Sequence, residues 1–350
     1  MKKMLAMLLA LVMILGLAAC ASTKPAADAT ATSEPSNTGD SASAETSAEA
    51  SDAAPAESGK TYTVGVCQLI QHEALDAATQ GFIDALKEEL GDAVTVDVQN
   101  ASGDSVNCGT IVNGFVAKGV DLIMANATPA LTAAVSATAD IPILGTSITA
   151  YGVALDIDDF NGTVGGNVSG TSDLADLQAQ AQMILDWFPE TKTVGLLFCS
   201  AEPNSRYQID EVRKALEAQG VTCEEFAFTD SNDVSSVTQK AADFSDVVYI
   251  PTDNTAASNT EAIANVLIPA GVPAICGEEG LCRGCGVATL SISYYDLGVT
   301  TGKMAAKILK GEADISTMPV EYTDATPKYN ASVCEQLGIT PLDGYEAIDG

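Results

Sequence analysis

The stretch Thr63–Leu90, TVGVCQLIQHEALDAATQGFIDALKEEL, contains the unit that decides the fold. Its first apolar residues predict a buried strand, and the polar elbow Gln71-His72-Glu73 follows soon after. Gly91 stands just past the stretch, where a helix end favours a residue that tolerates positive φ. Between the elbow and this glycine, apolar residues recur at the spacing of one helix face: Leu75, Phe82, Leu86 and Leu90. The stretch therefore predicts a strand, a turn and a helix in succession.

The same alternation of strand and helix recurs along most of the chain. Further strands are expected in the first half at 94–98, 122–124 and 141–144, and in the second half at 193–198, 222–226, 247–250 and 273–276. Strands that alternate with helices in this way form parallel sheets covered by helices on both faces. The sequence thus predicts an α/β fold of two doubly wound parallel-sheet lobes joined by hinge strands.

A glycine-rich stretch without helical period, 151–169, separates the two halves. We therefore expect lobe 1 to span 61–168 and lobe 2 to span 169–293. A late helix follows the second half, so we expect the chain to cross back, with 294–312 returning to lobe 1 and 316–350 returning to lobe 2. Ligands of such sheets bind at the carboxyl ends of the strands, which predicts a site in the cleft between the lobes.

Composition limits the possible partners. The chain has 350 residues, of which 47% are apolar and 18% are charged, as in a globular protein with buried sheets. This length is enough for two domains that each have a core. With 16 Lys and Arg against 47 Asp and Glu, the formal net charge is −31. A surface this acidic lacks the basic residues that bind phosphate, so nucleic acid is excluded as a partner.

The first 20 residues predict an export signal. Lys2 and Lys3 precede an apolar run, and Leu17-Ala18-Ala19-Cys20 ends it. The run is shorter than the roughly 20 apolar residues of a membrane-spanning helix. The last four residues resemble a bacterial lipobox, in which the cysteine thiol receives a lipid and becomes the mature N-terminus. Cys20 is therefore the expected lipid attachment site, and a plain exported protein is the alternative.

Residues 21–60 are almost entirely Ala, Ser, Thr, Glu, Asp and Pro. Such a segment buries too little apolar surface to offset the entropy of ordering it. We expect a disordered stalk that holds the folded region away from a membrane.

Catalysis and metal binding have few candidate residues. His72 is the only histidine, and no G-x-S-x-G elbow accompanies it, so we interpret His72 as a ligand or surface side chain and the chain as no enzyme. Cys276, Cys282 and Cys285 form the one tight cysteine cluster. A C-x-x-C pair can bind zinc or form a disulfide, but no fourth zinc ligand stands nearby. We expect no metal and no cofactor, and free thiols and a disulfide both remain open.

The chain resembles the substrate-binding lipoproteins of bacterial ABC transporters with the type I periplasmic-binding-protein fold. More narrowly, it resembles the branch associated with tryptophan, tyrosine and phenylalanine uptake. The resemblance is carried, in order along the chain, by VGVCQLIQHEALDAATQGFIDALKE (64–88), NATPALTAA (126–134), DIPILGTSITA (140–150), GGNVSGTSD (165–173), YIPTDNT (249–255) and YYDLGVTTGKMAAKILKG (294–311). It implies a small amino acid, aromatic by resemblance only, as the ligand.

A zwitterionic ligand needs donors for its carboxylate and oxygen acceptors for its ammonium. We expect the donors at helix N-termini beginning at Thr128-Pro129-Ala130 and at Ser172-Asp173, with hydroxyl groups beside them. Asp253, after a strand of the other lobe, is the expected partner of the ammonium. Helix capping is the alternative role of Thr128, Ser172 and Asp253. The complete set of candidate ligand-binding residues is Gln68, His72, Thr128, Thr146, Ser147, Ser172, Asp173, Asn204, Ser205, Asp253, Asn254 and Glu278.

The resemblance implies a monomeric, lipid-anchored extracytoplasmic receptor that closes on its ligand and presents the closed form to ABC permease subunits. Two alternatives remain open at this stage. A surface sensor would share the fold and the cleft, and a receptor for another small solute, such as a nucleoside or a sugar, would share the mechanism.

Overall fold

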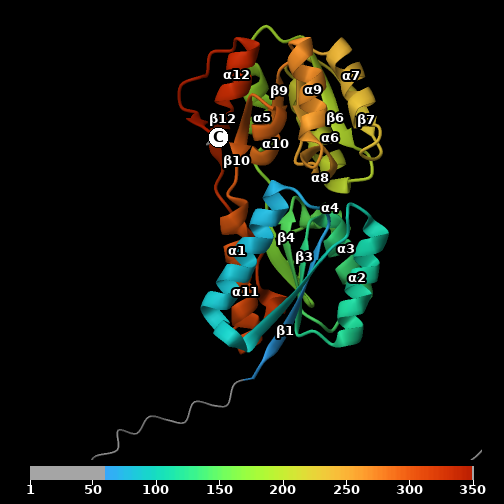
Figure 1. Cartoon of the computed structure of the whole chain (residues 1–350), viewed down its shortest axis with the longest axis vertical. Coiled ribbons are helices and arrows are strands. Elements are labelled where there is room, and N and C mark those ends of the chain that lie inside the picture. The colour runs from blue at the N-terminus through green and yellow to red at the C-terminus, as the bar shows by residue number, and fades with distance from the viewer. Residues whose placement is uncertain (1–59, 349–350) are drawn as a thin grey trace, which may run out of the picture. The chain divides into compact units, whose positions relative to one another are not determined.

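The computed structural model of the chain describes residues 60–348, which form two α/β lobes, each built on its own largely parallel sheet (Figure 1). The predicted fold class is therefore confirmed. The predicted signal peptide with Cys20, and the predicted stalk apart from residue 60, lie outside the described residues. No helix within the described residues is long and apolar enough to cross a membrane.

Lobe 1 is built on a six-stranded sheet with the order β11-β5-β4-β3-β1-β2, in which all neighbours are parallel. Its strands are β1 (Tyr62–Gln68), β2 (Val94–Asn100), β3 (Leu122–Asn126), β4 (Ile143–Ile148), β5 (Val168–Ser172) and β11 (Glu321–Tyr322). Helices α1 (Glu73–Leu90) and α11 (Tyr294–Lys310) cover one face, whereas α2 (Ser105–Lys118) and α3 (Thr128–Ala137) cover the other (Figure 1). The short elements η1 (Gly91–Ala93), α4 (Tyr151–Ala154) and η2 (Ile315–Thr317) complete the lobe.

Lobe 2 is built on a seven-stranded sheet with the order β13-β12-β10-β9-β8-β6-β7, in which β12 runs antiparallel to β10. Its strands are β6 (Thr193–Cys199), β7 (Thr222–Phe228), β8 (Val247–Ile250), β9 (Ala274–Cys276), β10 (Ala288–Ser291), β12 (Thr326–Tyr329) and β13 (Glu346–Ala347). Its helices are α5 (Leu177–Trp187), α6 (Pro203–Glu217), α7 (Val234–Phe244), α8 (Asn254–Ala257), α9 (Thr260–Ala270), α10 (Glu279–Cys285) and α12 (Ala331–Leu337). One core lies beneath α5, α6 and α12, and a second lies beneath α7, α9 and α10.

The chain crosses between the lobes three times, and two of the predicted boundaries need correction. The predicted start of lobe 2 at residue 169 falls inside β5, which pairs with β4, so the first crossing begins after Ser172. The second crossing, after Ser291, leads into α11 of lobe 1. The predicted return of 316–350 to lobe 2 is too early, because β11 still pairs with β5 and the third crossing follows Tyr322. The apolar pattern of the sequence misplaced both boundaries, because this pattern does not show which strands pair through their backbones.

The starts of two helices close to the site, α5 and α3, differ from the predicted ones. The Asp176 side chain caps α5 by accepting from the Gln178 and Ala179 amides at 2.9 and 3.0 Å. This corrects the expectation that a helix begins at Ser172-Asp173, because Asp176 and not Ser172 is the N-cap. Likewise, the N-cap of α3 is Ala127 rather than Thr128, and Ala127 holds a φ of 87°.

Glycines let α1 and α11 lie against each other along their length (Figure 1). A Cβ at Gly298 would stand 2.0 Å from the carbonyl oxygen of Ala78, and one at Gly81 would stand 2.1 Å from that of Tyr295. Neither backbone atom can move without displacing its helix, so the close approach requires glycine at both positions. This packing positions the start of α11, where the chain enters lobe 1 from its second crossing.

We expect Gly298→Ala to lower the free energy of unfolding by about 1–3 kcal/mol, because the new methyl group overpacks the helix contact. Gly114→Ala is the matched control, since position 114 is also helical but has nothing within 4 Å of a new Cβ. That control should gain about 0.4–1 kcal/mol, because alanine loses less backbone entropy on folding. Urea denaturation of both variants measures the difference, and equal stability of the two would contradict this account.

Candidate ligand site

Both lobes line a small cavity, the inner cavity, with a volume of about 10 Å³. Its lining residues come from strand ends and helix starts of both lobes and from two of the crossings: His72, Leu75, Ser147, Thr149, Asp173, Asn204, Thr252, Asp253, Asn254, Ala257, Glu278 and Tyr294. This volume holds about one water molecule. A ligand of amino-acid size therefore requires the lobes to separate before it can enter.

Seven of the twelve predicted site residues line this inner cavity: His72, Ser147, Asp173, Asn204, Asp253, Asn254 and Glu278. The other five lie nearby but do not line it: Gln68, Thr128, Thr146, Ser172 and Ser205. The twelve residues stand at or next to the ends of strands and the starts of helices. The division between them follows from which ends meet between the lobes, and sequence alone does not give this pairing.

Three of the five residues outside the inner cavity, Gln68, Ser172 and Thr146, hold the scaffold together. Gln68 donates to Asp76 at 2.6 Å and accepts from Thr79 at 2.6 Å, which anchors the end of β1 to α1. Ser172 donates to the Thr149 carbonyl at 3.1 Å and so fixes the start of the first crossing. Their ligand-binding role stays a prediction, and their present partners are structural.

Thr146 joins a buried chain of hydroxyl groups that ties the sheet of lobe 1 to α11. Its Oγ1 lies 3.1 Å from that of Thr171, which in turn lies 2.9 Å from that of Thr301. Thr128 and Ser205 are also buried, with 3% and 0% exposure. None of the three side chains opens onto the inner cavity.

Carboxyl groups dominate the lining of the inner cavity. Asp173, Asp253 and Glu278 line it, each at most 3% exposed, and none of the lining residues is a lysine or an arginine. Burial raises the pKa of Asp173, and it raises the pKa of Glu278 to about 7. Burial, together with the charge of Glu202, raises the pKa of Asp253 to about 8. A cavity of this composition favours a ligand that brings a positive charge.

Asp253 and Glu278 both act as helix caps, which is the alternative considered for Asp253. Asp253 accepts from the amides of Ala256 at 2.8 Å and Cys199 at 2.6 Å. Glu278 accepts from the amides of Gly280 and Leu281 at 2.6 and 2.5 Å. Each carboxylate oxygen therefore already has a backbone donor. Both carboxyl groups are therefore already hydrogen-bonded within the chain.

Glu202 is a site component that the sequence analysis missed. It is 4% exposed and accepts from the Asn254 side chain at 2.6 Å, from the Asn254 amide at 3.0 Å and from the Thr255 hydroxyl at 2.8 Å. It thereby fixes the loop that carries Asp253 and Asn254 into the inner cavity. Glu202 stands directly before Pro203, the first residue of α6. A proline at the first position of a helix is a sequence signal that could have marked Glu202 as a helix-start residue.

His72 and Asn254 meet across the two lobes, with His72 Nε2 3.3 Å from Asn254 Oδ1. Because the Asn254 amide nitrogen donates to Glu202, its oxygen faces the histidine, which therefore carries its proton on Nε2. Burial lowers the pKa of His72 and keeps the ring neutral. A second contact, an ion pair between Glu73 of α1 and Arg283 of α10, also joins the lobes.

Two larger hollows adjoin the inner cavity. The mouth hollow, of about 180 Å³, is lined by residues of both lobes and includes the apolar side chains of Leu69, Ile70, Pro129 and Ala201. Asn254 lines both this hollow and the inner cavity. The mouth hollow and the inner cavity therefore meet at Asn254.

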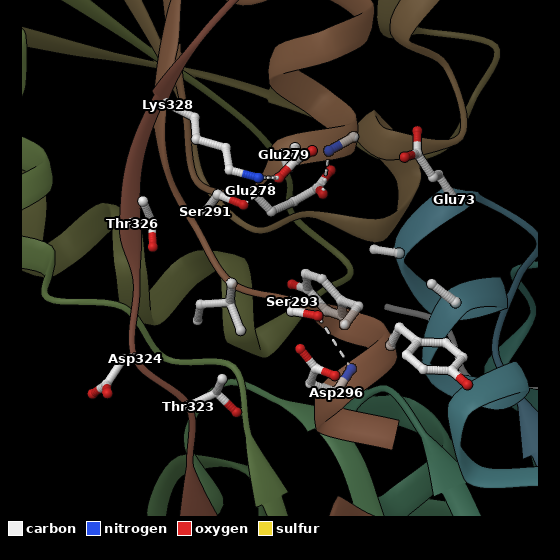
Figure 2. Close-up of a pocket in the computed structure, with 16 residues that line it drawn as sticks. Glu73, Glu278, Glu279, Ser291, Ser293, Asp296, Thr323, Asp324, Thr326 and Lys328 are labelled. Carbon is white, nitrogen blue, oxygen red and sulfur yellow. Dashed lines mark hydrogen bonds and ion pairs between the residues drawn. The ribbon is translucent and has the colours of Figure 1, made fainter. Parts of the chain in front are cut away.

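The outer groove, of about 470 Å³, lies over the hinge crossings (Figure 2). Some of its polar groups pair with one another: Lys328 reaches Glu279 at 2.8 Å, Ser291 also donates to Glu279, and Ser293 accepts from the Asp296 amide at 3.2 Å (Figure 2). The outer groove is thus larger than the inner cavity, but the one lysine in its lining is already paired with a carboxylate.

The cysteine cluster has no role in the site. Cys276 lies in β9, whereas Cys282 and Cys285 lie in α10, and all three are buried. The eight cysteines in the described region of the chain are free thiols. Within residues 60–348, no group of three or more His, Cys, Asp or Glu residues is arranged to hold a metal.

A family model described as ABC transporter substrate binding protein matches residues 63–344. A tyrosine-binding protein of Clostridioides difficile (strain R20291) is 32% identical over 276 residues, which cover 77% of this chain and 79% of that protein. Both comparisons span nearly all of the two lobes described above.

Two solved structures are similar to the chain at 32% identity each. A Streptococcus pneumoniae ABC domain in complex with L-Trp matches with a TM-score of 0.78, over 82% of this chain and 100% of that one. The ligand-free, open structure of a Clostridium difficile substrate binding protein with adhesive properties matches with a TM-score of 0.63, over 83% and 99%.

The raised pKa values predict how stability changes with pH. Asp253 titrates at about 8 in the native state against 3.8 when exposed, and Glu278 at about 7 against 4.5. The native state therefore holds protons that the unfolded chain has lost, so these groups give their full stability below about pH 4 and lose it as pH rises toward 8. We expect the free energy of unfolding to fall between pH 5 and pH 8, by at most about 1.4 kcal/mol per pH unit for each group.

Asp253→Asn should flatten this decline, because the variant has no proton to release at that position. Asp246→Asn is the control: backbone amides of Lys192 and Thr193 lower the pKa of Asp246, so its contribution changes only at acid pH. Urea midpoints at pH 5, 6.5 and 8 measure both slopes. The explanation fails if Asp253→Asn keeps the wild-type slope.

Proposed function

Because this chain belongs to the family of ABC transporter substrate-binding proteins, we propose that it is an extracytoplasmic lipoprotein that captures an amino acid and delivers it to an ABC importer. Proteins of this family bind solutes, so the chain is a binding protein and not an enzyme. The observation that carries the proposal is the inner cavity. Both lobes line it, and its lining contains three carboxyl groups but no lysine or arginine.

The mechanism follows from which residues share the inner cavity. His72 and Ser147 belong to lobe 1, whereas Asn204 and Glu278 belong to lobe 2. A ligand that touches both sets gains contacts only when the lobes are together, so it stabilises the closed form by that difference in affinity. The permease then recognises the closed arrangement. Hinge closure about a few crossing segments is the ordinary way in which two lobes make this movement.

An amino acid with an apolar or aromatic side chain fits the lining best. Its ammonium favours the ionised form of a buried carboxyl group by pairing with it, which a neutral sugar or nucleoside cannot do. Its side chain can use the mouth hollow beside Leu69 and Ile70. The names of two relatives support this class of ligand, since one is a tyrosine-binding protein and another was crystallised with L-Trp.

The N-terminal sequence supports delivery at a membrane surface. Leu17-Ala18-Ala19-Cys20 matches the pattern for lipid attachment, and the polar segment after it can hold the lobes away from the bilayer. Two or more acyl chains on Cys20 give stable anchoring, since each buried CH₂ contributes about 0.8 kcal/mol. A receptor held there meets its permease without loss by diffusion.

We expect L-tyrosine, L-tryptophan or L-phenylalanine to raise the melting temperature of residues 60–348, because a ligand stabilises only the folded state that binds it. At 100 times its Kd, such a ligand adds about 2.7 kcal/mol. Thermal-shift assays followed by calorimetry measure this, with glucose and adenosine as the comparison ligands. A shift with glucose or adenosine and with no amino acid would overturn the ligand class and leave the family membership intact.

We expect Cys20→Ala to release the full-length chain from the membrane fraction, because this substitution removes the only thiol in the lipobox-like sequence. Radiolabelled palmitate incorporation and detergent partitioning measure the modification and its effect. Cys67→Ala is the matched control, since Cys67 is a buried core thiol that the lipid chemistry cannot reach. Equal palmitate labelling of the Cys20→Ala variant and the wild type would exclude the anchor.

A further inference from the structure

We propose that Ser147 Oγ, Asp173 Oδ1 and Asn204 Oδ1 together form a binding site for a primary ammonium group of the ligand. This inference rests on the proposed function and names the chemical group that the inner cavity selects. The three side chains come from lobe 1, from the first crossing and from lobe 2. One ammonium bound there joins all three regions of the hinged molecule.

These three oxygens are buried and have no hydrogen-bond partner among the described residues. Their residues are 5%, 3% and 4% exposed, and all three line the inner cavity. A buried polar atom without a partner is destabilising, and native structures contain few of them. Three in one small cavity therefore indicate a site whose partner is supplied from outside the chain.

Asp173 is the one carboxylate of the inner cavity that keeps an oxygen free. Its Oδ2 accepts from the Tyr294 hydroxyl at 2.8 Å, whereas its Oδ1 has no partner within residues 60–348. Asp253 and Glu278 use both of their oxygens to accept backbone amides. The ammonium partner is thus Asp173, in place of the Asp253 that the sequence suggested.

The side-chain amide nitrogen of Asn204 donates to other groups of the chain, which leaves its oxygen, Oδ1, to accept a hydrogen bond from a ligand. Its amide nitrogen donates to Glu202 at 3.3 Å and to the Thr252 carbonyl at 3.2 Å. If the amide were flipped, its oxygen would face that carboxylate and that carbonyl, and neither can donate a hydrogen bond. Its Oδ1 is therefore the atom left to accept a hydrogen bond, and it has no partner among the described residues.

Ser147 is turned into the inner cavity by an irregularity of its strand. The register between β4 and β5 shifts between Gly145 and Ile148, and Ser147 has a φ of 56°. A bulge of this kind changes the direction of a side chain at the end of a strand. A positive φ is uncommon for serine and costs conformational free energy. Here it occurs at a residue that lines the inner cavity.

The number and type of these groups match a primary ammonium. An –NH₃⁺ group has three N–H donors and no acceptor, and the site offers three acceptor oxygens, one of them on a carboxylate. A sugar hydroxyl brings one donor and no charge. A ligand without this ammonium would leave at least two of the three oxygens unsatisfied, so affinity should depend strongly on the amine.

The test measures three ligands against wild-type residues 60–348 by calorimetry: L-tyrosine, tyramine, which lacks the carboxylate, and 3-(4-hydroxyphenyl)propanoate, which lacks the amine. We expect the amine-free analogue to bind at least 100-fold more weakly than L-tyrosine. If both bind equally, the ammonium site is overturned and the proposed amino-acid function stands. If tyramine binds and L-tyrosine does not, the ammonium site is supported and the amino-acid function is overturned.

Variants then assign the site to these residues. Asp173→Asn should weaken L-tyrosine binding by about 100-fold and reduce the affinity ratio between L-tyrosine and its amine-free analogue to less than 10. Ser147→Ala and Asn204→Leu should each reduce the same ratio. Asp324→Asn is the matched control, because it removes a carboxylate from the outer groove on the third crossing and should leave the ratio unchanged.

The ratio compares two ligands on one protein, so a general loss of stability in a variant does not change it. An unchanged ratio in Asp173→Asn would overturn the assignment. If that variant does not fold, the three-ligand comparison on the wild type still decides the ammonium site.

Discussion

Carboxylates buried without a neighbouring cation are the constraint on which the arrangement of the two lobes depends. A charged group leaves water only when hydrogen bonds replace its hydration. Asp253 and Glu278 accept the amides at the starts of α8 and α10, which offsets part of this cost but leaves the pKa of both groups raised. Glu202 accepts the amides of Asn254 and Thr255. Parallel strands followed by helices supply such amides at one edge of each sheet, so the fold itself makes an acidic interior tolerable.

The hinge and the site share residues, so movement of the lobes and ligand binding are coupled. Asp173 begins the first crossing, and Tyr294 follows the second, and the two are joined by a hydrogen bond at 2.8 Å. The same two side chains line the inner cavity. A ligand that pairs with Asp173 therefore acts on two of the three segments about which the lobes move.

The size of a hollow is a poor guide to its role in this molecule. The outer groove exceeds the inner cavity in volume, yet Lys328, Glu279 and Ser291 satisfy one another within it. The inner cavity holds about one water molecule, yet three buried oxygens on its lining residues have no partner within residues 60–348. Unsatisfied polar groups, and not open space, mark the place where an external ligand gains the most free energy.

The sequence by itself determined the alternating strands and helices, the two lobes, the acidic character and seven residues that line the inner cavity, because these follow from local periodicity and from the rule that parallel sheets bind at their strand ends. Only the tertiary structure decided which ends face each other, so Gln68 and Thr146 serve the scaffold whereas Ser147 reaches the inner cavity. It is also the basis for proposing Asp173 rather than Asp253 as the ammonium partner. Both are aspartates next to strand ends, and they differ only in how many backbone amides the folded chain brings to each carboxylate.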